Sequence, residues 1–161
     1  MRNRFNFTAH RSPLTAKLIV LAFLAFSFGS TLAGQQTLCQ QVGQNFTPTV
    51  PVIGTNPNSV NTSSSLGVSS WYNEKVEING TLVINSNFFI TQCTLMMGTN
   101  AKIEVEGANT FSSFGSLYYH CGTNYWMGFV IQAGATAQST FWGNHIEDAV
   151  RAIDIRSGSS K

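Results

Sequence analysis

The most reactive side chains of this 161-residue chain are its cysteines and histidines. Cys93 and Cys121 lie 28 positions apart, His120 directly precedes Cys121, and His145 follows further along the chain. A thiolate and an imidazole form a nucleophilic pair only when a third group orients the histidine within a cleft, and the sequence points to no such group. No CxxC or Cys/His spacing indicates a bound metal. The sequence therefore assigns no catalytic residue, no metal ligand and no cofactor.

Charged residues recur at a single spacing. Glu104 lies 27 positions after Glu77, and Lys102 lies 27 positions after Lys75. On a repetitive fold each pair would stack into a ladder, which we interpret as a solvated strand face. A second charged group lies near the C-terminal end: Glu147, Asp148, Arg151 and Asp154. A glycosidase needs two carboxylates a defined distance apart across a groove, and the sequence does not place these residues across one.

Aromatic residues form a candidate binding site. An exposed aromatic ring can stack on the apolar face of a sugar. Four aromatic residues cluster in the sequence and are the candidate carbohydrate contacts: Tyr118, Tyr119, Tyr125 and Trp126. The alternative is that these rings pack inward or against turns. Trp142 follows further along the chain.

A recurring glycine indicates how these residues are positioned. Gly80, Gly107 and Gly134 are each 27 residues apart, and each is expected to lie in a turn between strands. A fixed period in the twenties is typical of a solenoid, in which each repeat is one coil stacked on the next. The period places Cys93 and Cys121 on adjacent coils, where they are a candidate disulfide. The alternative is a buried pair of reduced thiols.

The residues around these glycines have the pattern of strands. Residues 76–78 and 103–105 alternate apolar and acidic side chains, as half-buried strands do. Residues 81–84, 88–93 and 95–97 are further apolar runs, rich in β-branched and aromatic residues that disfavour a helix. Parallel strands joined by crossovers are nearly always right-handed. We therefore predict an all-β protein, a right-handed parallel β-helix of about three 27-residue coils over residues 75–161.

The same residues carry a resemblance to a known group of proteins. Residues 75–156, from the run VEINGTLVINSNFF to HIEDAVRAIDI, resemble the right-handed parallel β-helix repeats of large secreted bacterial surface proteins, a pectin-lyase-like fold. The resemblance implies a scaffold that supports many activities. Further modules and a C-terminal sorting domain commonly follow such repeats. The next glycine of the period would fall at residue 161, so we expect a fragment whose solenoid is truncated at its C-terminal end.

The first 34 residues are predicted to be a secretory signal peptide. Basic residues precede an uncharged apolar run at 18–28, and the small residues of 29–34 follow. This run of 11 apolar residues is shorter than the roughly 20 that a membrane-spanning helix requires. The protein is thus expected to be secreted or on the cell surface, without a transmembrane span in the mature chain.

Residues 35–74 form a polar leader, which is a candidate N-terminal cap. The segment contains Pro48, Pro51 and Pro57 and has no charged residue from Gln35 to Ser70. The exposed edge of a first coil is normally covered, and this segment could cover it. The alternative is a flexible leader.

These observations favour a non-enzymatic structural or adhesive module. The alternative is a polysaccharide-binding or polysaccharide-degrading β-helix of the lyase or hydrolase kind. After residue 34 the chain has five Lys or Arg residues against seven Asp or Glu residues, and no basic patch, which argues against nucleic-acid binding. The expected partners are a carbohydrate or cell surface, and a second copy bound through the open end of the β-helix.

Overall fold

The computed structural model describes residues 37–135 and 139–156, and the predicted signal peptide lies outside these ranges. Two short helical segments, α2 (Leu38–Val42) and η1 (Gly43–Asn45), precede the strands. The strands and one further 3-10 turn follow in this order: β1 (Val60–Thr62), η2 (Ser63–Ser65), β2 (Ser70–Tyr72), β3 (Lys75–Ile78), β4 (Thr81–Ile84), β5 (Phe88–Thr91), β6 (Thr94–Met97), β7 (Lys102–Val105), β8 (Phe111–Phe114), β9 (Leu117–Tyr119), β10 (Gly128–Ile131), β11 (Ser139–Trp142), β12 (His145–Ile146) and β13 (Ile153–Ile155). Among the described residues, no helix has the length and apolar content needed to cross a bilayer.

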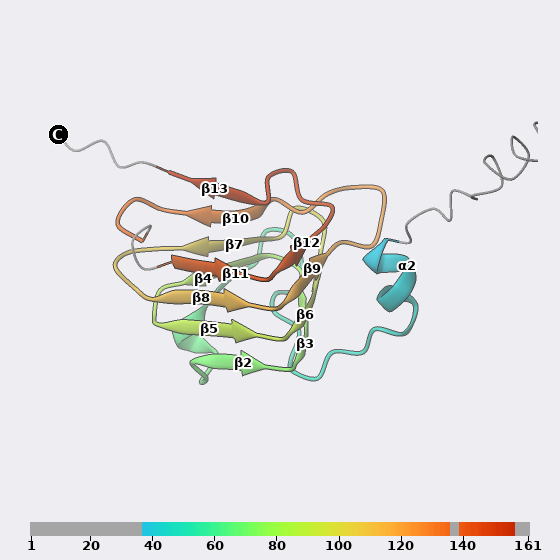
Figure 1. The fold of residues 1–161 in the computed structure, drawn as a ribbon, viewed down its shortest axis with the longest axis horizontal. Coiled ribbons are helices and arrows are strands. Elements are labelled where there is room, and N and C mark those ends of the chain that lie inside the picture. The colour runs from blue at the N-terminus through green and yellow to red at the C-terminus, as the bar shows by residue number, and fades with distance from the viewer. Residues whose placement is uncertain (1–36, 136–138, 157–161) are drawn as a thin grey trace, which may run out of the picture. The chain divides into compact units, whose positions relative to one another are not determined.

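The strands form three parallel sheets wound into a right-handed β-helix, which confirms the predicted fold class (Figure 1). Sheet A has the order β12-β9-β6-β3, sheet B the order β1-β4-β7-β10-β13, and sheet C the order β11-β8-β5-β2. From β2 onward the chain passes through sheets C, A and B in turn and then starts the next coil. The described residues make about four coils, whereas the sequence predicted about three.

The turn from sheet C to sheet A is the constant feature of every coil. It has two residues each time, and the first of them adopts the left-handed conformation. Asparagine and glycine tolerate this conformation best. The residues at this position, with φ values of 55°, 54°, 58° and 64°, are Asn73, Gln92, Gly115 and Gly143.

The turns into and out of sheet B vary in length, and for this reason the fixed 27-residue period is wrong. Lys75 pairs with Thr94, 19 positions later; Thr94 pairs with Leu117, 23 later; and Leu117 pairs with His145, 28 later. Gly80 precedes its sheet B strand, β4, whereas Gly107 and Gly134 follow theirs, β7 and β10. The three glycines do lie in turns between strands, but only the last two lie in corresponding turns, one position out of register.

Inward-facing side chains form continuous apolar rows along the helix axis. In sheet B, Leu82 pairs with Ile103 and Ile103 with Phe129, and all three side chains are fully buried. Phe129 also packs edge-on against Tyr118 of sheet A and Phe141 of sheet C, with ring centroids 4.9 Å apart in both pairs. The core therefore consists of the lumen between the three sheets, filled coil by coil.

The solenoid begins before residue 75. Strands β1 and β2 already pair with β4 and β5, so the predicted boundary at 75 falls inside the first coil. Just upstream, Ile53 forms a parallel bridge with Ile78, and Thr49 N donates to the carbonyl oxygen of Lys75 at 2.8 Å. Residues 49–53 thus cover the outer edge of β3.

Candidate functional site

The structure buries three of the four predicted carbohydrate contacts. Tyr118, Tyr119 and Trp126 have no exposed surface, whereas Tyr125 is 58% exposed. Tyr118 faces the lumen, and Tyr119 lies on the other side of its strand beneath the ring of Phe46, 6.2 Å away. A ring must present a face to solvent to stack on a sugar. The predicted aromatic platform is therefore wrong, because its residues pack inward or beneath the N-terminal segment.

Burial also fixes the chemistry of these aromatic residues. It raises the pKa of Tyr118, and it raises the pKa of Tyr119 to about 12. The Tyr118 hydroxyl lies 2.5 Å from Ser113 Oγ, which in turn donates to Asn144 Oδ1. The Trp126 indole N–H donates to the carbonyl oxygen of Glu147 at 2.8 Å. These groups are neutral and serve packing.

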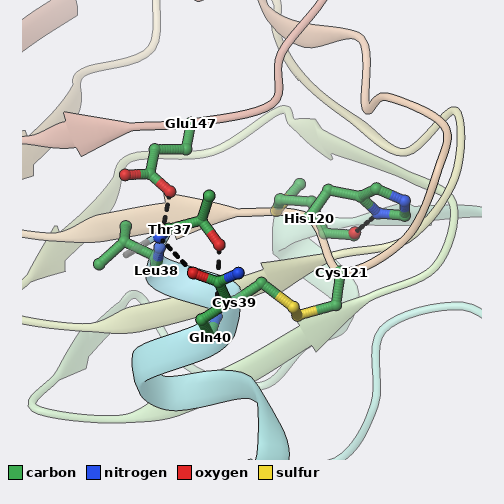
Figure 2. The surroundings of a disulfide bond; sticks show 8 residues. Thr37, Leu38, Cys39, Gln40, His120, Cys121 and Glu147 are labelled. Carbon is green, nitrogen blue, oxygen red and sulfur yellow. Dashed lines mark hydrogen bonds between the residues drawn. A yellow bond between two sulfur atoms is a disulfide. The ribbon is translucent and has the colours of Figure 1, made fainter. Parts of the chain in front are cut away.

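The disulfide joins Cys39 to Cys121, not Cys93 to Cys121 (Figure 2). The Cα atoms of the bonded pair are 5.3 Å apart, and 82 positions separate them in sequence. Cys93 is a buried free thiol. Cys93 directly precedes β6, whereas Cys121 follows β9, so the two residues lie at opposite ends of sheet A. The spacing of 28 exceeds the 23 residues of this coil, so Cys93 aligns with Ser116 of the next coil and not with Cys121.

The disulfide fastens helix α2 to the later coils, together with a second contact. Leu38 N donates to Glu147 Oε2 at 2.8 Å, and Figure 2 shows this bond beside the disulfide. Burial raises the pKa of Glu147, but the bonds from Leu38 N–H and His145 outweigh it, so the pKa is lowered overall. Thr37 and Gln40 complete a capping box at the start of the helix.

No thiol–imidazole pair is assembled within the described ranges. Burial raises the pKa of Cys93, and its Sγ lies 3.2 Å from the carbonyl oxygen of Thr91. His120 is buried, with Nδ1 2.6 Å from the carbonyl oxygen of Met97, and His145 Nε2 lies 2.8 Å from a carboxylate oxygen of Glu147. The described residues also contain no group of three or more His, Cys, Asp or Glu side chains arranged to hold a metal ion.

The predicted ladders of like charge do not form. Glu77 pairs with Met96 in sheet A, whereas Glu104 lies in sheet B between Val83 and Val130. Lys75 and Lys102 likewise lie in different sheets. The second charged group divides as well: Arg151 Nη1 is 3.3 Å from Asp154 Oδ1, while Glu147 turns to helix α2.

The outer face of sheet C carries exposed aromatic rings that the sequence analysis did not select. Tyr72 and Trp142 are 67% and 65% exposed, and Phe89 and Phe114 are each 40% exposed. Residues alternate between the two faces of a strand, so these side chains project outward from sheet C. The strands that carry them, β2, β11, β5 and β8, are labelled in Figure 1. Phe114 and Trp142 pair across neighbouring strands and stack at 4.5 Å between ring centroids.

Hydroxyl side chains occupy the remaining outward positions of sheet C. The pairing of β2, β5, β8 and β11 gives two outward rows across the sheet. One row runs Tyr72, Thr91, Phe114, Trp142, and the other runs Ser70, Phe89, Ser112, Thr140. None of these eight residues is charged. We call this surface of eight residues the aromatic face.

A local signal for the aromatic face exists in the sequence. An aromatic residue directly precedes the left-handed turn residue in three of the four coils: Tyr72-Asn73, Phe114-Gly115 and Trp142-Gly143. The spacing between these pairs changes with coil length, so a search for a fixed period does not align them.

Comparison with known proteins gives no relative from which a role could be transferred. No model of a protein family matches the chain, and no curated protein and no solved structure gave a match.

Proposed function

We propose that this chain is a non-enzymatic, adhesive β-helix module of a secreted or cell-surface protein, and that its aromatic face binds polysaccharide. The observation that carries the proposal is the row of exposed rings on sheet C, set among hydroxyl groups and free of charge. Aromatic faces stack on the C–H faces of sugar rings. Serine and threonine hydroxyls both donate and accept hydrogen bonds, as sugar hydroxyls require.

The dimensions of the face suit an extended or insoluble chain better than a single sugar. Neighbouring strands lie about 4.8 Å apart, so rings on the four strands of sheet C span several sugar lengths. Each stacked ring is expected to contribute on the order of 1 kcal/mol. Such contacts are weak individually and become effective when several act on one polymer.

Two features support export. The Cys39–Cys121 disulfide fits an oxidising compartment. The predicted signal peptide at residues 1–34 indicates the same route.

The non-enzymatic character is supported by how the reactive groups are used. The raised pKa of Cys93 makes its thiol a poor nucleophile. His120 is held by a backbone carbonyl group.

The experiment that tests the proposal is a depletion assay on insoluble polysaccharides. The protein from residue 35 onward, with its disulfide intact, is mixed with cellulose or chitin, and the unbound fraction is measured. We expect Trp142→Ala to weaken retention roughly threefold and Trp142→Ala with Phe89→Ala roughly tenfold. Tyr125→Ala is the matched control, because Tyr125 is 58% exposed but lies outside the aromatic face.

The outcomes separate the competing interpretations. Equal retention of the Tyr125 and Trp142 variants would overturn the assignment of the aromatic face. Retention of none of the polysaccharides by the wild-type protein would overturn the adhesive function. Release of soluble sugar from the retained polymer would show a degrading enzyme and overturn the non-enzymatic interpretation.

A further inference from the structure

A cleft lies on the outer face of sheet B, at the last coil. Its volume is about 320 Å³, and its walls come from β7, β10, β13 and the turns beside β10 and β13. The residues lining it are Lys102, Met127, Val130, Val150, Arg151, Asp154 and Arg156. The described ranges contain four Lys or Arg residues in all, and three of them line this cleft; the fourth is Lys75. Such a concentration of cations is unusual in a chain with so few.

An acidic residue holds the two arginines in place. Asp154 Oδ1 lies 3.3 Å from Arg151 Nη1, and Asp154 Oδ2 lies 3.7 Å from Arg156 Nε. Each guanidinium has five N–H donors, so a single contact with Asp154 leaves most of them for a ligand. The carboxylate thus lies beside both guanidinium groups and leaves most of their N–H donors free for a ligand.

The third cation is fixed in a similar way. Lys102 Nζ lies 2.6 Å from Glu104 Oε2, and Gln132 donates to the other oxygen of that carboxylate. Burial raises the pKa of Glu104, but the bonds from Lys102 and Gln132 lower it by more, so the carboxylate stays charged in mildly acidic solution. With Glu104 and Asp154 both counted against the three cations, one net positive charge remains at the cleft.

We propose that this cleft binds an oxyanion group carried on a small organic body. Guanidinium forks match the paired oxygens of phosphate, sulfate and carboxylate groups, and they do so better than an ammonium group does. The volume exceeds that of a bare anion, and Met127, Val130 and Val150 supply an apolar wall for the rest of the ligand. The site is separate from the aromatic face, since it lies on a different sheet.

The proposal is tested by titrating ligands into the disulfide-bonded protein and measuring binding by NMR or calorimetry. The probes are D-glucose 6-phosphate, D-glucuronate, inorganic phosphate and inorganic sulfate, with D-glucose as the neutral match. We expect the two sugar anions to bind more tightly than the inorganic anions, glucose not to bind, and added NaCl to weaken binding. A stronger response to glucose 6-phosphate than to glucuronate would assign a phosphate ligand, and the reverse order a carboxylate ligand.

Variants decide whether the cleft is responsible. Arg151→Ala with Arg156→Ala should reduce affinity at least tenfold, whereas Lys75→Ala, which removes the fourth cation, should leave it unchanged. Arg156→Lys retains the charge but loses the fork, and should weaken binding by an intermediate factor. Equal losses of affinity in the Lys75 and arginine variants would show that binding depends only on the net charge of the protein, and would overturn the proposal. Trp142→Ala must leave anion binding intact, so failure here is distinguishable from failure of polysaccharide binding.

Discussion

The two ends of the solenoid differ in how much of their inward-facing side chains is exposed to solvent. At the N-terminal end, Trp71 faces the lumen from β2 and is only 5% exposed. At the C-terminal end, Ile153 and Ile155 continue the inward row of sheet B but are 39% and 60% exposed. The same row is fully buried at Ile103 and Phe129. Both ends have large apolar residues at inward positions, and these residues differ in how far they are exposed to solvent.

The N-terminal end is covered by chain that precedes the first coil. Residues 49–53 pair with β3, and Leu66 and Val50 pack against the core beneath it. At each end one strand of every sheet is outermost: β1, β2 and β3 at the N-terminal end, and β11, β12 and β13 at the C-terminal end. Residues 49–53 pair with β3, whereas no other described segment pairs with the outer edge of β12. Outermost strands present backbone groups that can pair with another chain. Among the described residues, the two ends therefore differ in whether a further segment pairs with the outermost strand of sheet A.

The largest expected effect contrasts an inward residue of sheet C at the N-terminal end with an inward residue of sheet B at the C-terminal end. Trp71→Ala removes a buried ring that packs edge-on to Phe88, with centroids 4.9 Å apart. It should lower the free energy of unfolding by about 3–5 kcal/mol. Ile155→Ala at the open end should cost less than about 1 kcal/mol, because its side chain is already mostly in water. Urea denaturation monitored by circular dichroism measures both, and equal costs would show that the ends are finished alike.

Loss of the disulfide should have the next largest effect. Cys39→Ser with Cys121→Ser opens a cross-link over 82 positions and should cost about 2–5 kcal/mol. The cross-link ties α2, which precedes the segment covering the N-terminal end, to the third coil. Dithiothreitol should lower the midpoint of thermal unfolding in the wild type and in Cys93→Ala. The double serine variant should show no further change on reduction.

A charge introduced at the exposed inward positions of β13 should weaken any association through the C-terminal end. We expect two copies to associate through this end, and we expect Ile155→Asp to weaken that association at least tenfold, because a carboxylate would be buried at the contact. Light scattering across a concentration series measures it. Val60→Asp is the matched control, since Val60 is 66% exposed at the N-terminal end. An equal loss in the Val60 variant would indicate head-to-tail stacking and contradict the contrast between the ends.

The smallest expected effect is on the pH dependence of the unfolding free energy, through the Glu147 carboxylate that holds helix α2. The folded-state pKa of Glu147 is lowered, since bonds from Leu38 N–H and His145 outweigh the opposing effect of burial. A lowered pKa contributes stability above the unfolded value near 4.5, and this is lost as pH falls through the folded value. Unfolding free energies between pH 6 and pH 3 should therefore fall less steeply in Glu147→Gln than in the wild type. Glu106→Gln, at an exposed turn, is the matched control.

Much of the strand content could be predicted from local patterns. The alternation of Val76 and Ile78 around Glu77 placed β3 correctly, and the run at residues 81–84 coincides with β4. The 27-residue period was misleading because it matches only the distance between Gly107 and Gly134 in equivalent turns. Earlier coils are shorter, and no local feature of the sequence predicts the length of the turns into and out of sheet B.

The candidate sites depended on contacts that local patterns do not contain. The predicted disulfide paired Cys93 with Cys121, but the packing of α2 beside sheet A brings Cys39 to Cys121. Tyr118 and Trp142 are both aromatic residues near turns, yet one faces the lumen and the other faces solvent. A shift of one residue in a strand reverses this choice.

The sequence by itself determined that the chain forms short strands in stacked coils, because alternation and turn residues act over a few neighbours. Only the tertiary structure decided which residues stack, which cysteines bond and which rings reach solvent. These depend on the length of each turn and on the register of strands about twenty to thirty positions apart. Both are set by the fit of side chains across the lumen.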